Sequence, residues 1–170
     1  MGQGARFKAE VIAYNRLGDG DAAFWVPECY GYIPPGSFRK LLPTYRTSNS
    51  PKFAVSLRDS QGQCTAILLE YINGVTATPA AFLNHSLYES ALEGLKRIHQ
   101  AGILHDDIAG QNLMVSHDGS RVWWIDFDSS KNTIMHNILS EFYAEEMDEA
   151  KDRLAHLHEE GEVIPVRART

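Results

Sequence analysis

The chain has 170 residues, 44% of them hydrophobic, which is enough to bury one sizeable core or two small lobes and excludes a disordered chain. Its 16 basic and 22 acidic side chains give a net charge of −6 without long runs of one sign, which argues against nucleic-acid and membrane-surface partners. No apolar stretch approaches the roughly 20 residues of a membrane helix, and neither a signal segment nor a disulfide framework is visible, so we expect a cytoplasmic, intracellular protein.

In the first half of the chain, the pattern of apolar and turn-forming residues predicts one helix and several strands. Apolar residues recur at helical spacing over residues 6–17, and Gly18, Asp19 and Gly20 form a turn that ends this helix. An aromatic-rich strand follows over residues 27–33, and then a proline-rich loop over 34–51. Residues 53–59 and 64–72 flank a short polar turn, which predicts a hairpin.

The second half predicts two helices around a pair of strands. A helix is expected over residues 78–101, with Thr78 and Pro79 at its N-cap and first turn. A short strand over 113–116 and an apolar strand over 122–128 follow, joined by a turn, and a polar helix covers 138–161. Trp123 and Trp124 point to opposite faces of a strand, so one should be core and the other should lie at an interface or in solvent.

Three short oxygen-bearing side chains mark a candidate site. Asp107, Asn112 and Asp126 fall in a predicted loop and at the ends of the two strands beside it. Such ligands suit Mg²⁺, which takes one or two carboxylates together with substrate phosphates. A single D-x-x-x-x-N is weak evidence, because loops are rich in Asp and Asn for turn formation.

The ordered set of motifs resembles the protein-kinase-like superfamily. The matching residues are Glu10 in the first helix, LLEYING at 68–74, RIHQAGILHDDIAGQN at 97–112 and VWWIDFD at 122–128. The resemblance implies an α+β, kinase-like fold in one domain over 1–170. Residues 6–74 would be a partial N-lobe, consisting of the αC helix and the hinge hairpin. Residues 75–161 would be an abbreviated, mainly helical C-lobe, and 162–170 a tail.

The resemblance also implies roles for individual residues, with ATP and Mg²⁺ as cofactors. Asp107 would take the proton of the attacking hydroxyl, Asn112 and Asp126 would hold metal, and His105 would support the loop by packing and hydrogen bonding. In the same way, the backbone at Glu70, Tyr71 and Ile72 would read adenine. Glu10 would correspond to the helix acid that pairs with a phosphate-binding lysine.

Several positions depart from the protein-kinase pattern. Nothing before Glu10 supplies a glycine-rich loop or a strand lysine, and Asp106, Ala109 and Asp128 stand where arginine, lysine and glycine are common. This form is more similar to aminoglycoside phosphotransferases, choline kinases and kinase-like proteins of fungi. The expected substrate is therefore a protein or small-molecule hydroxyl. The alternative is an inactive pseudokinase-type binding or regulatory module, or a fragment without the phosphate-binding loop.

Overall fold

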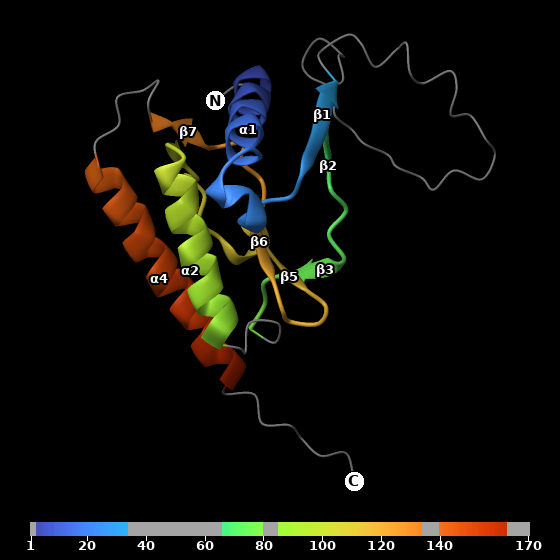
Figure 1. The fold of residues 1–170 in the computed structure, drawn as a ribbon. Helices are drawn as coiled ribbons and strands as arrows, with labels where there is room; N and C mark the ends of the chain where they lie inside the picture. Colours follow the sequence, from blue (N-terminus) through green and yellow to red (C-terminus); the bar gives the residue numbers. More distant parts are fainter. Residues whose placement is uncertain (1–2, 34–65, 80–84, 134–139, 163–170) are drawn as a thin grey trace, which may run out of the picture.

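The computed structural model describes residues 3–33, 66–79, 85–133 and 140–162 (Figure 1). Within these ranges the fold is α+β: three long helices surround small antiparallel sheets. The helices are α1 (Gln3–Leu17), α2 (His85–Gln100) and α4 (Ser140–Glu162), and the short 3₁₀ helices are η1 (Asp21–Trp25) and η4 (Gly110–Asn112). The strands are β1 (Cys29–Ile33), β2 (Ala66–Leu69), β3 (Gly74–Thr76), β4 (Ile103–Leu104), β5 (Leu113–Ser116), β6 (Val122–Trp124) and β7 (Lys131–Asn132).

The described strands form three separate antiparallel sheets. β1 pairs with β2, with an irregularity between Cys29 and Gly31. β5 lies between β3 and β6, and Leu113 stands opposite Trp124. β4 pairs with β7 through Ile103 opposite Asn132 and Leu104 opposite Lys131. This last pair is only two residues long, yet it connects the segment before Asp107 with the segment after Asp126.

The core is organised around α2. One face of this helix is fully apolar and packs against β6 and η1, while α4 runs alongside it (Figure 1). The indole of Trp124 is completely buried, and its Nε1 donates a hydrogen bond to the carbonyl of Ala91 at 2.9 Å. Burying an aromatic ring of this size stabilises the fold by about 2–3 kcal/mol, provided that the indole N–H is satisfied.

Most predicted elements are present, with small changes of boundary. The first helix begins at Gln3 and ends at Leu17, β1 and β2 fall within the predicted strands, and β5 and α4 agree closely with the sequence. Two segments, 34–51 and 53–59, lie outside the described residues, so the partner of β2 in the described part of the chain is β1. The division into 6–74, 75–161 and 162–170 stays a prediction.

Two expectations were wrong. The helix predicted over 78–101 begins at His85, so Thr78 is not its N-cap. The strand predicted over 122–128 ends at Trp124, because Asp126 adopts a φ of 63°, which no β-strand allows. Of the two tryptophans, Trp124 belongs to the buried core cluster, as expected for one of them, whereas Trp123 is 7% exposed, lies outside that cluster and has the guanidinium of Arg121 over its ring at 4.5 Å.

No helix in the described ranges is both long enough and apolar enough to cross a bilayer.

Gly94 is a sensitive position of the α2 interface, because a Cβ there would lie 2.6 Å from Cγ of Trp25. We expect Gly94→Ala to lower the free energy of unfolding by about 1–3 kcal/mol through overpacking, as measured by urea denaturation. Gly4→Ala is the matched control, since Gly4 also lies in a helix but a Cβ there would meet nothing within 4 Å. That control should be neutral or stabilising by up to about 1 kcal/mol, and equal destabilisation of both variants would contradict the packing argument.

Candidate functional site

The structure brings the loop of residues 105–112 next to the segment that follows β6. The backbone N–H of Ile125 donates to the carbonyl of Asn112 at 2.9 Å, which extends the β5–β6 ladder by one bond. Asp126 is the next residue after Ile125. The main chain therefore places Asn112 and Asp126, which are distant in sequence, at the same end of one hairpin.

Asp107 and Asn112 are joined directly. The side-chain amide of Asn112 donates to Oδ2 of Asp107 at 2.8 Å and to its backbone carbonyl at 3.0 Å. Asn112 is 3% exposed, whereas Asp107 is exposed. Because the NH₂ group of Asn112 is engaged with Asp107, its Oδ1 is the side-chain atom that could face a cation. The Asp107 carboxylate keeps capacity for a further hydrogen bond from a substrate hydroxyl.

His105 is completely buried beneath this loop. Its ring lies against Phe127 and Trp124, with centroid distances of 4.7 and 5.3 Å. Burial lowers the pKa of His105, so the ring is neutral at pH 7. Nε2 lies 3.1 Å from the carbonyl of Ile125 and must carry the proton, because a carbonyl can only accept. His105 thus holds the two site segments together by packing and by one hydrogen bond.

Asp126 lies in an environment that disfavours its charge. Burial raises the pKa of this carboxyl, and the negative charge of Asp128 raises it further, with a smaller contribution from Asp107. Within the described ranges, no three His, Cys, Asp or Glu side chains gather closely enough to hold a metal ion by themselves. One carboxylate from Asp126 and one amide oxygen from Asn112 nevertheless fit Mg²⁺, because this ion usually takes few protein ligands and completes its shell with phosphate and water.

Glu10 faces the same acidic segment from α1. Burial raises the pKa of Glu10 to about 7, and the charges of Asp126 and Asp128 contribute to the rise. Arg6, one turn earlier on α1, forms an ion pair of 3.0 Å with Asp128. Among the described residues no ion pair involves Glu10 itself. In the described part of the chain, Glu10 therefore lies near two carboxylates, those of Asp126 and Asp128.

The predicted adenine-binding segment follows β2 and is partly engaged within the chain. The Glu70 N–H donates to the carbonyl of Glu28 at 2.8 Å, and the Glu70 carboxylate accepts from the Glu28 N–H at 3.2 Å. The carbonyl of Ile72 accepts from the N–H of Gly74 at 3.0 Å. Tyr71 is 87% exposed. Two of the backbone groups in this segment are thus already paired, and any adenine contact falls to the others.

Glu146 on α4 is the principal site residue that sequence reasoning missed. Its carboxylate accepts three hydrogen bonds: from Nε2 of His99 at 2.6 Å, from the His105 N–H at 3.1 Å and from the Asp106 N–H at 2.6 Å. Burial would raise the pKa of Glu146, but these three donors outweigh it and hold the pKa below the ordinary value. The sequence offers no signal for this role, because Glu146 lies in a helix rich in acidic residues.

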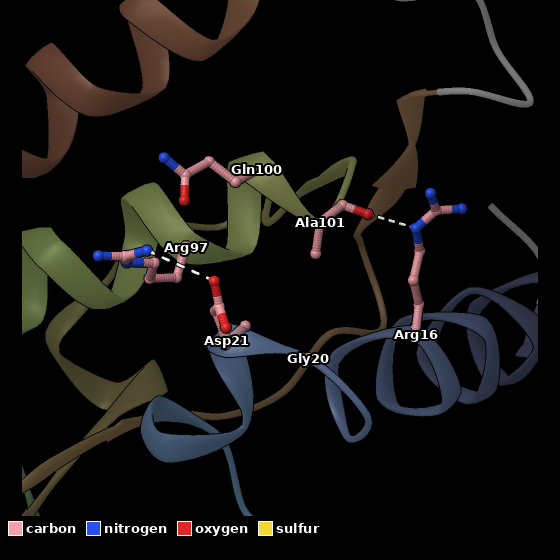
Figure 2. A pocket seen from close by; sticks show the side chains of 7 residues that line it. Arg16, Gly20, Asp21, Arg97, Gln100 and Ala101 are labelled. Atoms are coloured by element: carbon pink, nitrogen blue, oxygen red, sulfur yellow. Dashed lines mark hydrogen bonds and ion pairs between the residues drawn. The ribbon is translucent and has the colours of Figure 1, made fainter.

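A recess of about 370 Å³ lies away from these residues (Figure 2). It is bounded by the end of α1, the start of η1 and the last turn of α2. Arg97 approaches Asp21 across it at 3.6 Å, and the Arg16 guanidinium donates to the carbonyl of Ala101 (Figure 2). The Arg16 contact satisfies one carbonyl at the C-terminal end of α2, and none of Asp107, Asn112 and Asp126 lines the recess.

Comparison with known proteins gives a partial similarity to a kinase. No protein-family model matches the chain. Over 74 residues the chain is 31% identical to a protein of Dictyostelium discoideum described as "Probable serine/threonine-protein kinase fnkB". The matched stretch covers 39% of this chain and 14% of that protein, so the chain spans about one seventh of the length of this relative. The similarity is consistent with a distant kinase-like relationship over part of the chain.

Replacement of Glu146 by Gln should loosen the loop of residues 105–112. A glutamine amide cannot accept from all three donors, so we expect the free energy of unfolding at pH 7 to fall by about 3 kcal/mol. Because the pKa of Glu146 is lowered in the folded state, its contribution is present above the unfolded value of 4.5 and is lost as the pH falls below it. Urea denaturation at pH 7 and pH 3 should therefore show a difference between wild type and variant that shrinks in acid. Glu145→Gln, which changes an exposed neighbour on the same helix, is the control and should leave the free energy of unfolding almost unchanged at either pH. A loss of stability in Glu146→Gln that is the same at both pH values would refute the account based on three hydrogen bonds.

Replacement of Glu10 by Gln should have the opposite pH dependence. The pKa of Glu10 is raised from 4.5 to about 7, so the folded state holds its proton more tightly and stability declines as the pH rises through this range. Gln removes the buried charge, and after allowance for solvent screening we expect a gain of about 1 kcal/mol at pH 8 and almost none at pH 5. Thermal denaturation at both pH values measures this difference, with Glu145→Gln again as control. A gain of the same size at both pH values would contradict the assignment.

Proposed function

We propose that this chain carries the catalytic loop of a kinase-like phosphotransferase, which transfers phosphoryl groups from ATP to a protein or small-molecule hydroxyl with Mg²⁺. The observation that carries the proposal is the bond between Asn112 and Asp107, in a loop that the Ile125–Asn112 backbone bond joins to Asp126. Phosphoryl transfer depends on alignment and charge neutralisation, which is what one positioned base beside two oxygen ligands provides.

Each residue then has a defined task. Asp107, oriented by Asn112, accepts the proton of the attacking hydroxyl at Oδ1 or Oδ2. Asn112 and Asp126 hold the metal through oxygen atoms. His105 and Glu146 hold the loop in place through hydrogen bonds to the backbone of Ile125, His105 and Asp106. Mg²⁺-ATP, when bound, supplies the transferable phosphoryl group with part of its charge neutralised. Burial and the negative charge of Asp128 raise the pKa of Asp126, and a nearby cation would favour the charged form of this carboxyl, which supports the proposal.

The order of elements supports a kinase-like fold for the same region. A helix bearing Glu10 is followed by the β1–β2 pair, the connecting segment of Glu70–Ile72, the long helix α2, the loop with Asp107 and the β5–β6 hairpin. The local similarity to a Dictyostelium kinase favours the same fold. In this proposal residues 70–72 approach adenine through the backbone groups that are not already paired.

A second candidate is a kinase-like module that binds nucleotide or metal without turnover. The environment of Glu10 favours it, because this acid faces Asp126 and Asp128 rather than a phosphate-binding cation among the described residues. Such a module would keep the oxygen ligands but would lack one charged contact to the phosphates. Losing a contact of this kind typically costs two to three orders of magnitude in rate, or about 3–4 kcal/mol.

The decisive variant is Asp107→Asn, which keeps the shape of the side chain and removes the base. For an active phosphotransferase we expect kcat to fall by about 10²–10⁴-fold, measured as ADP release from Mg²⁺-ATP with and without hydroxyl acceptors. Asp19→Asn, in the turn after α1, is the control and should keep full activity. Turnover that survives unchanged in Asp107→Asn would reject the proposed base.

Thermal denaturation with ATP and Mg²⁺ separates the two candidates. A ligand that binds only the folded state at ten times its Kd stabilises it by about 1.4 kcal/mol. Wild type and Asp107→Asn should both show this stabilisation, whereas Asp126→Asn should lose it together with the metal. Stabilisation without turnover in the wild type would establish the binding module, and no stabilisation at millimolar ATP would reject nucleotide binding altogether.

A further inference from the structure

An ion pair connects the two segments of the candidate site on the side of Asp106. The ammonium of Lys131 lies 2.6 Å from Oδ2 of Asp106, and both side chains are about one-third exposed. Asp106 immediately precedes Asp107, and Lys131 is the fifth residue after Asp126. The pair thus connects the chain just before the candidate base with the chain just after the candidate metal ligand.

The fold brings these two residues together through a minimal sheet. β4 and β7 pair over two residues, with Leu104 opposite Lys131, so Asp106 comes two positions after the last strand residue. Beyond β7, the N–H of Thr133 donates to the carbonyl of Gly102 at 2.9 Å. A two-residue strand pair is too short to fix the position of the following loop by itself. A side-chain contact at the end of such a pair therefore affects the position of the loop more than the same contact beside a long sheet would.

The backbone at Asp106 is also unusual. Asp106 has a φ of 62°, and in the described part of the chain only Asp126 shares this left-handed conformation among non-glycine residues. Aspartate tolerates the region better than most side chains but still prefers others. Two contacts hold it there: the Asp106 N–H bonded to Glu146 at 2.6 Å and the carboxylate bonded to Lys131. The orientation of the backbone at Asp107 therefore depends on the contacts of Asp106 with Glu146 and with Lys131.

We propose that Lys131 is a positioning residue for Asp107: its ion pair with Asp106 closes the loop of residues 105–112 against β7 and fixes the orientation of the candidate base. The role of Asp107 as a base rests on the function proposed above. The clasp, meaning the Asp106–Lys131 ion pair and the loop closure that it maintains, does not depend on that function. An exposed ion pair contributes little to global stability. Its effect should therefore appear locally, in the loop, and not in the melting temperature.

Amide hydrogen exchange measured by mass spectrometry on the full chain tests the clasp without any need for turnover. In Lys131→Met, which keeps the aliphatic stem and removes the charge, we expect exchange in peptides spanning 105–112 to become about threefold faster, while peptides from α2 stay unchanged. Lys131→Arg should restore the wild-type rate. Lys151→Met is the matched control, because it breaks another Lys–Asp pair, with Asp148 at 2.8 Å, on the distant face of α4.

A double-mutant cycle tests whether the two residues act together. Asp106→Asn keeps a side chain that tolerates positive φ and removes the charge, so its effect should equal that of Lys131→Met, and the double variant should be no worse than either single variant. Unchanged loop exchange in Lys131→Met, or additive effects in the double variant, would overturn the proposal.

Steady-state kinetics then separate the clasp from the proposed function. If the chain turns over ATP, Lys131→Met should lower kcat about threefold at an unchanged KM for Mg²⁺-ATP, because the base is displaced while the nucleotide contacts remain. Unchanged kcat beside faster loop exchange would overturn the positioning role. Faster loop exchange in Lys131→Met, combined with a wild type that shows no turnover, would support the clasp and reject the phosphotransferase.

Discussion

The geometry of the candidate site depends on one buried carboxylate. Glu146 accepts hydrogen bonds from His99 and from the backbone of His105 and Asp106, and it is 5% exposed. A buried charge of this kind is tolerated only when donors surround it, and here two of the donors are the main chain of the loop itself. Ala150 and Leu154 follow Glu146 at four-residue steps and are buried on the same stripe of α4. The packing of α4 against α2 therefore determines where the loop before Asp107 lies.

The site contains two pairs of aspartates close in sequence, Asp106 with Asp107 and Asp126 with Asp128, and the members of each pair have different partners. Asp106 is paired with Lys131 and Asp128 with Arg6, while Asp107 is held by a neutral amide and Asp126 has a raised pKa. Asp106 and Asp128 are thus engaged in ion pairs within the chain, whereas Asp107 and Asp126 form no ion pair among the described residues. Glu10, whose pKa is raised to about 7, adds a further carboxyl group to the same region. Because like charges in a partly buried site repel, a bound cation would reduce the repulsion among these carboxylates.

Local sequence patterns predicted the helices and strands where they reflect burial. The helix ending at Leu17, the strand LMVS and the long C-terminal helix follow from apolar periodicity, and the structure agrees. The patterns failed where single backbone conformations or contacts between distant segments decide the outcome. The apolar run after Val122 predicts a longer strand than the structure has, because Asp126 turns into the left-handed region. β3 and β7 are too short to carry any periodicity and form because β5 and β4 offer them partners.

The candidate site shows the same division. By itself, the sequence determined which residue types are available, since the spacing of Asp107 from Asn112 and the acid after the second strand can be read directly, and it determined that the fold is α+β. Only the tertiary structure decided that Asn112 bonds Asp107, that Glu10 lies among carboxylates and that Glu146, Lys131 and Arg6 belong to the site. These relations join residues up to 122 positions apart along the chain. Sequence periodicity reports which face of an element is buried, whereas partners so far apart are set by how the elements pack.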